Sequence, residues 1–222
     1  VKGRVRAVSS HRVAVLMINQ ARPPFDSESL RHRLARLLDM RFRREVLGKL
    51  ERVDGRSVEV DSVFPVRGQE GGAGLPPLAD DLVEPYLAQL HEATGNRPLS
   101  LKVEVNNSLS ERGAVAVKKR LSGQSGLSVE LKRLSSGQFQ REVRDGRTFD
   151  LAICVLDFAD PLLHLGGLLD ARESDAGGAS LNFLGVRGQA VMQGVVRFRE
   201  ARDWKEVFAA RRELDEGMRD RA

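Results

Sequence analysis

An apolar run framed by acids occupies Phe149–Pro161, which reads FDLAICVLDFADP. The run has the length and composition of a buried strand. Asp160-Pro161 then predicts a turn, because aspartate and proline both favour turn positions. The stretch therefore predicts a buried strand whose last residues, around Asp157, lie where a ligand could bind.

Strand-like and helix-like segments alternate along the rest of the chain. Apolar or alternating runs predict further strands at 12–19, 57–63, 99–105 and 127–134. Helical spacing of apolar residues predicts helices at 27–38, 39–47, 78–93, 108–121, 137–144, 162–169, 189–200 and 203–219. This alternation indicates an α/β fold with a mixed sheet flanked by helices. We expect a single domain over residues 1–222, with a flexible Gly- and Pro-rich loop at about 67–77.

The charge balance is basic, with a net charge of +5 over 222 residues. An arginine-rich surface can bind nucleic acid. Here the arginines are interspersed with 31 acids, and aromatic residues that could stack on bases make up only 5% of the chain. The densest basic cluster, Arg41–Arg44, falls on a predicted helix face. These features disfavour nucleic-acid binding by this segment.

Catalytic and metal-binding patterns are missing from the sequence. Cys154 is the only cysteine, which excludes a disulfide framework, and its apolar neighbours predict a small core residue. The four histidines show no metal-type spacing, and no nucleophile elbow or phosphate-binding loop is present. We therefore predict no enzyme activity, no cofactor and no metal. Trp204, at the start of a predicted helix, is expected to be a packing residue.

The Phe149–Pro161 stretch resembles a signature of the family 5 extracellular solute-binding proteins, which bind peptides, nickel complexes and sugars for uptake transporters. In that family an apolar strand ends in Gly-Trp, any residue, a small residue, Asp, an aromatic residue or Asn, any residue, an acid and Pro. Leu156–Pro161 matches the last half of this pattern, and Cys154 stands where the family has tryptophan. Weaker similarity extends over nearly all 222 residues, including Val15–Asn19, Pro24-Phe25-Asp26 and Leu30–Ala35.

The resemblance implies one lobe of a type II periplasmic-binding-protein fold. Such proteins have two lobes, and this chain is similar to the second. Because the chain opens on Val1 without an initiator methionine, we expect it to be part of a longer protein that carries the first lobe.

The resemblance also implies a binding site. Asp157 would pair with the α-ammonium group of a peptide ligand, and Ile153, Cys154 and Val155 would form a strand edge whose main-chain groups hold the peptide. A cysteine in place of tryptophan would reshape the pocket. Asp157 could instead cap the turn before Pro161, a role for which Asp160 is equally suited.

Two functions follow from the resemblance. The first is the solute-binding component of an ABC-type uptake transporter, which would capture a peptide-like solute, a sugar or a metal chelate and deliver it to a membrane permease. This protein would be periplasmic or extracellular and anchored to the membrane as a lipoprotein. The alternative is the ligand-sensing domain of a cytoplasmic transcriptional regulator. A signal peptide or a DNA-binding motif in a preceding segment would distinguish the two.

Overall fold

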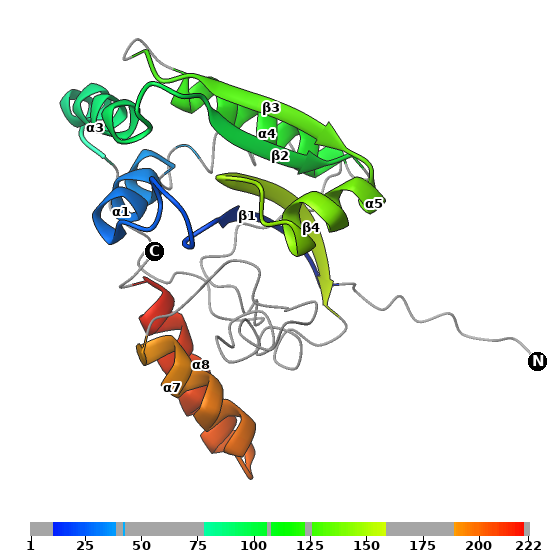
Figure 1. Ribbon diagram of the computed structural model, residues 1–222. Helices are drawn as coiled ribbons and strands as arrows, with labels where there is room; N and C mark the ends of the chain where they lie inside the picture. The colour runs from blue at the N-terminus through cyan, green and yellow to red at the C-terminus, as the bar shows by residue number, and fades with distance from the viewer. Residues whose placement is uncertain are drawn as a thin grey trace, which may run out of the picture.

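The computed structural model describes residues 11–38, 42, 78–105, 108–122, 126–158 and 189–219 (Figure 1). The strand expected at 57–63, the helix expected at 162–169 and the loop at 67–77 lie outside the described residues. Of the helix expected at 39–47, only Phe42 is described, and it is helical. The other predicted helices and strands can be compared directly with the structure.

The core of the fold is a four-stranded mixed sheet. Its strands are β1 (His11–Ile18), β2 (Leu99–Glu104), β3 (Val129–Leu134) and β4 (Leu151–Phe158), in the order β1-β4-β2-β3. β2 is parallel to β3 and to β4, whereas β1 is antiparallel to β4. The predicted mixed sheet is therefore confirmed. β4, the strand predicted within Phe149–Pro161, lies in its interior between β1 and β2.

The helices lie close to their predicted positions. They are α1 (Glu28–Leu37), α3 (Asp80–Ala93), α4 (Ser108–Leu121), α7 (Gln189–Glu200) and α8 (Trp204–Arg219). The segment predicted as one helix at 137–144 is instead a short α-helix, α5 (Ser136–Phe139), which continues as a π-helix, η1 (Gln140–Asp145). π-helical turns are rare and frequently occur at functional sites.

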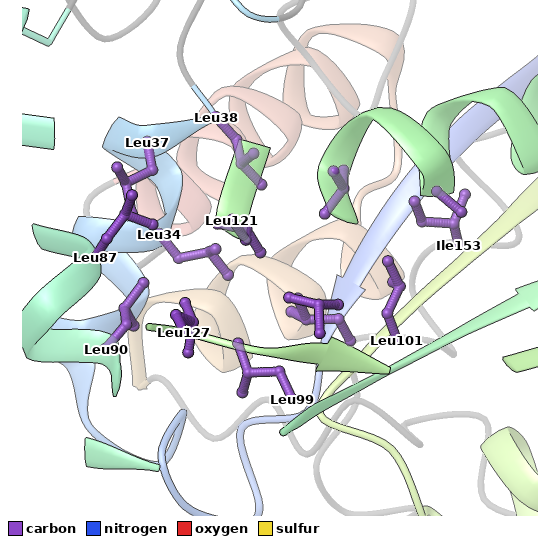
Figure 2. Packing of buried hydrophobic residues seen from close by; sticks show 14 of the residues in the cluster. Leu34, Leu37, Leu38, Leu87, Leu90, Leu99, Leu101, Leu121, Leu127 and Ile153 are labelled. Atoms are coloured by element: carbon purple, nitrogen blue, oxygen red, sulfur yellow. The ribbon is translucent and has the colours of Figure 1, made fainter. Parts of the chain in front are cut away.

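Apolar side chains fill both faces of the sheet. One core packs between the sheet and α1, α3 and α4, and Figure 2 shows its leucines converging from these helices on the strands. The other core lies under α5 and η1 and contains Phe139, Val143, Ala152 and Cys154. Successive β4 residues point into opposite cores, because side chains alternate along a strand. This two-sided burial explains why β4 reads as a continuous apolar run.

β2 departs from a simple alternating pattern. Its polar residue Lys102 is only 4% exposed and lies inside the sheet. Lys102 Nζ donates to Thr148 Oγ1 at 2.8 Å and lies 2.9 Å from Glu142 Oε2 on η1. Lys132 Nζ, in register with Lys102 on β3, donates to both oxygens of the same carboxylate. The π-helix thus places one carboxylate between two lysines of neighbouring strands.

Candidate functional site

The carboxyl-terminal edge of the sheet is the candidate site. β2, β3 and β4 are parallel, so their last residues, among them Glu104 and Asp157, end toward the same side. β1 runs the other way and begins at this edge, where Arg12 lies opposite Asp157 in the register. Ligands of α/β proteins commonly bind at the carboxyl ends of the strands.

Near this edge, β4 has a paired neighbour on only one side among the described strands. β4 pairs with β1 along its whole length, but its pairing with β2 ends at Val103 opposite Ile153. Among the described strands, the segment 154–158 therefore has a hydrogen-bonding neighbour on the β1 side alone. Ile153 is paired on both sides, so of the predicted strand edge at Ile153–Val155 only Cys154 and Val155 lie beyond the pairing with β2 in the described strands.

Two of the predicted site residues have buried side chains. Ile153 belongs to the core under α4, and Cys154, at 1% exposure, belongs to the core under η1. Burial, with a smaller contribution from the charge of Glu104, raises the pKa of the Cys154 thiol to about 12. The thiol is therefore protonated at neutral pH and packs as a small apolar residue, as the sequence predicted. Val155 is half-buried.

The amino-terminal turn of α4 lies at the same edge. The helix follows β2, and a Cβ added at Gly113 would lie 4.0 Å from Ile153 Cδ1. Glu111 in the first turn lies 3.4 Å from Arg133 near the end of β3. A helix amino terminus carries a partial positive charge that stabilises this acidic residue.

Acidic residues lie near the carboxyl ends of β2 and β4 and in the first turn of α4. Glu104 is half-buried and forms no ion pair within the described part of the chain, whereas Glu111 is paired with Arg133. Asp157 lies near the end of β4, opposite Arg12 in the register.

The acid at the opposite end of β4 has a structural role. Asp150 is 1% exposed, and its carboxylate accepts hydrogen bonds from Arg97 Nη1 at 2.6 Å, Arg97 Nη2 at 2.9 Å and Ser100 N at 2.8 Å. These contacts raise the pKa of the Arg97 guanidinium. Arg97 Nη2 also donates to Pro23 O at 2.7 Å, so the network joins the start of β4 to the segment after β1.

Asn19 completes this anchoring. Its side-chain amide donates to the carbonyls of Arg147 and Phe149, both at 3.0 Å, and its Oδ1 accepts from Ala21 N. All three groups of this buried side chain are engaged with the main chain, which holds β1 and β4 in register. Sequence reasoning missed Arg97 as a partner of Asp150, because the two lie 53 residues apart.

Among the described residues, no group of three or more His, Cys, Asp or Glu side chains gathers in a way that could hold a metal ion. None of the helices described is long and apolar enough to cross a membrane.

Comparison with known proteins identifies the fold. No protein-family model matches the chain, and no curated protein matches its sequence. Solved structures do match. The periplasmic binding protein DppA from Helicobacter pylori, in complex with the peptide STSA, aligns with a TM-score of 0.71 and 17% identity over 95% of this chain. AppA from Bacillus subtilis, an oligopeptide-binding protein in complex with a nonapeptide, aligns with a TM-score of 0.67 and 15% identity over 95%.

A nickel-binding relative aligns equally far along the chain. NikZ from Campylobacter jejuni, in complex with Ni(L-His), has a TM-score of 0.66 and 13% identity over 95% of this chain. The chain spans only 40% of DppA, 42% of AppA and 43% of NikZ. The chain therefore has the fold of one lobe of the periplasmic binding proteins for peptides and nickel, and its resemblance to the family 5 solute-binding proteins is confirmed at the level of the fold.

Proposed function

We propose that the chain is one lobe of the solute-binding component of an ABC-type uptake transporter. The observation that carries this proposal is the alignment of 95% of the chain with proteins whose structures contain a bound peptide or nickel complex. These relatives are binding proteins, which supports a binding role for this chain in place of catalysis. The regulator alternative receives no support from these structures.

The proposed binding site lies at the open edge of β4. Main-chain groups from Cys154 onward would hold an extended ligand as an added strand, since this part of β4 has one unpaired side among the described strands. Asp157 would pair with a positively charged group of the ligand. Ile153 would support the site from within the core, because its side chain is buried.

The proposal extends to the partners and the location. Residues 1–222 would form a single lobe that closes with a first lobe over a small solute of peptide-like, sugar or metal-chelate chemistry. Closure of two lobes excludes water and strengthens the few polar contacts that fix the ligand. A permease in the membrane would receive the solute, and the protein would be periplasmic or extracellular, tethered to the membrane as a lipoprotein.

A thermal-shift screen of the longest natural polypeptide that contains this chain tests the proposal. Short peptides, oligosaccharides and nickel chelates are the ligands to compare. A true ligand at a hundredfold excess over its dissociation constant should stabilise the folded state by about 2.7 kcal/mol. We expect Asp157→Asn to abolish most of the shift from one ligand class.

The control variant is Glu130→Gln, which removes an exposed acid at the other end of β3. It should leave the ligand-induced shift unchanged. A folded protein that shows no shift with any ligand class would refute the transport proposal. A shift that persists in Asp157→Asn would remove Asp157 from the site while retaining a binding function.

A further inference from the structure

The start of α8 exposes two aromatic side chains. Trp204 is 69% exposed and Phe208 is 52% exposed, so the prediction that Trp204 packs in the interior is wrong. The two residues lie one helical turn apart, and their ring centroids are 6.2 Å from each other. Exposed aromatic pairs of this kind commonly mark interaction surfaces.

The aromatic pair lies at the far end of a helical hairpin. Figure 1 shows α7 and α8 side by side, extending away from the sheet, with the turn between them at the distal end. The seam between the helices is formed by Val191, Val195, Ala210 and Leu214, all buried. Trp204 and Phe208 are not needed to close this seam, which leaves them available to a partner.

Unpaired cations surround the aromatic pair. Arg202, Lys205 and Arg212 are exposed and form no ion pair within the described part of the chain. Lys205, Phe208 and Arg212 fall on one side of α8, since residues three and four positions apart are neighbours on a helix. The exposed surface therefore combines apolar rings with free positive charge.

Acids also lie at the tip and keep their charges, but basic side chains outnumber acidic ones six to four over residues 197–213, so the net charge there is positive. Asp203 Oδ1 accepts from Glu206 N at 2.9 Å, and Glu206 Oε2 accepts from Arg202 N at 2.6 Å. These carboxylates satisfy main-chain donors and interact with the positive end of the helix dipole. The side chains of Arg202, Lys205 and Arg212 remain free to meet an external anion.

We propose that this α8 tip, defined by Arg202, Trp204, Lys205, Phe208 and Arg212, binds the surface of an anionic membrane. Aromatic rings partition into the headgroup region, and flanking lysine and arginine side chains pair with acidic headgroups. The apolar contribution of two rings is too small for an ordinary protein interface, which buries about 800 Å² on each partner. Shallow insertion of a hairpin tip requires much less area. The proposal does not depend on which solute the sheet edge binds.

The single tryptophan provides the measurement. Trp204 is the only tryptophan in the chain, so intrinsic fluorescence reports directly on the tip. The folded 222-residue chain is titrated with vesicles of phosphatidylcholine alone and with vesicles of equal parts phosphatidylcholine and phosphatidylglycerol. We expect the emission maximum to move to shorter wavelength with the anionic vesicles only, and the affinity to fall as salt is added.

Three variants separate the contributions of the rings and the charges. Phe208→Ala keeps the Trp204 reporter. It should weaken vesicle binding by about tenfold or more, because the apolar surface of the Phe208 ring is no longer transferred from water into the membrane. Lys205→Gln with Arg212→Gln should weaken it by about fivefold for each charge removed. Val115→Ala, at an apolar residue of α4 that is 48% exposed, is the matched control and should bind as the unaltered chain does.

Two results would overturn the proposal. The first is an emission maximum that does not respond to anionic vesicles, or a response that survives both the Phe208 and the charge variants. The second is a shift to shorter wavelength that grows with protein concentration in the absence of vesicles, which would mean that the tip contacts another copy of the chain. Far-UV circular dichroism of each variant confirms that α8 is retained.

Discussion

At the scale of single residues, the buried Lys102 requires its partner Glu142. An ammonium group inside a protein is costly unless it is paired and hydrogen-bonded. Lys102 obtains these contacts from Glu142 and Thr148, and Glu142 is shared with Lys132. Hydrogen bonds from Lys102, and then from Lys132, hold the pKa of the Glu142 carboxyl below its usual range.

The lowered pKa gives this contact a defined pH dependence. A carboxyl whose pKa is lower in the folded state than the ordinary value of about 4.3 stabilises the protein fully above that value. The contribution is lost as the pH falls through the lowered pKa. We expect Glu142→Gln to reduce the free energy of unfolding at neutral pH, and the deficit to shrink on acidification.

Urea unfolding of both proteins across the acidic range measures this difference. A second variant, Lys102→Met in the Glu142→Gln background, removes the ammonium that has lost its ion pair and should recover part of the lost stability. Further loss in the double variant would show that Lys102 does not depend on Glu142. A deficit that is constant with pH would contradict the role of the ionised carboxylate.

At the scale of elements, the α7–α8 hairpin depends on the close approach of its helices at Gly194. A Cβ added there would lie 2.8 Å from both Cγ and Cδ2 of Leu214, which is buried in the seam. Alanine gains about 1 kcal/mol over glycine inside a helix, but overpacking a seam costs about 1–3 kcal/mol. We expect Gly194→Ala to destabilise the hairpin, with faster amide hydrogen exchange in α7 and α8.

Gly113→Ala is the matched control for this prediction. Gly113 lies inside α4, where the added Cβ would make an ordinary contact of 4.0 Å with Ile153 Cδ1. The same substitution should therefore stabilise α4 by up to about 1 kcal/mol. Equal effects of the two alanines would show that the contact with Leu214 relaxes without cost.

Local periodicity was sufficient to locate most of the elements that the structure describes. The helices at 108–121 and 189–200 were predicted with the bounds that the structure shows, and β4 differs by only one or two residues at each end. Each of these segments buries one face or both, so the spacing of its apolar residues follows the buried face and indicates the type of element. The π-helical turn of η1 has no such signal, because it differs from an α-helix in the spacing of its hydrogen bonds.

The details of the site depend on contacts between distant segments. The position of Asp157 at a strand end followed from the sequence, but the open edge from Cys154 onward depends on the strand order β1-β4-β2-β3. The alternation of strands and helices does not specify this order. Likewise, the alternating pattern of β2 does not predict a partner for Lys102, because that partner, Glu142, lies on the later helix η1. The sequence predicts Trp204 as a packing residue at the start of a helix, whereas the structure exposes it.

At the scale of the whole molecule, the sheet provides at most one wall of a binding cleft. The chain spans about two fifths of the binding proteins that share its fold. Buried pairing at Asp157 would need a second wall, because a carboxylate in contact with water gains little from an added cation. The contacts of Asp150 fix the position of β4 in this wall. The wall alone cannot exclude water from the side of the cleft that faces it.

This reasoning predicts a large difference in affinity between the lobe and the two-lobed protein. For a solute that stabilises the longer polypeptide, we expect the 222-residue chain alone to bind at least about a hundredfold more weakly, since the polar contacts stay solvated. Isothermal titration calorimetry of the two proteins with the same solute measures this ratio. Similar dissociation constants would mean that the edge of β4 and the first turn of α4 form a complete site within this lobe, and closure between two lobes would then have no part in its affinity.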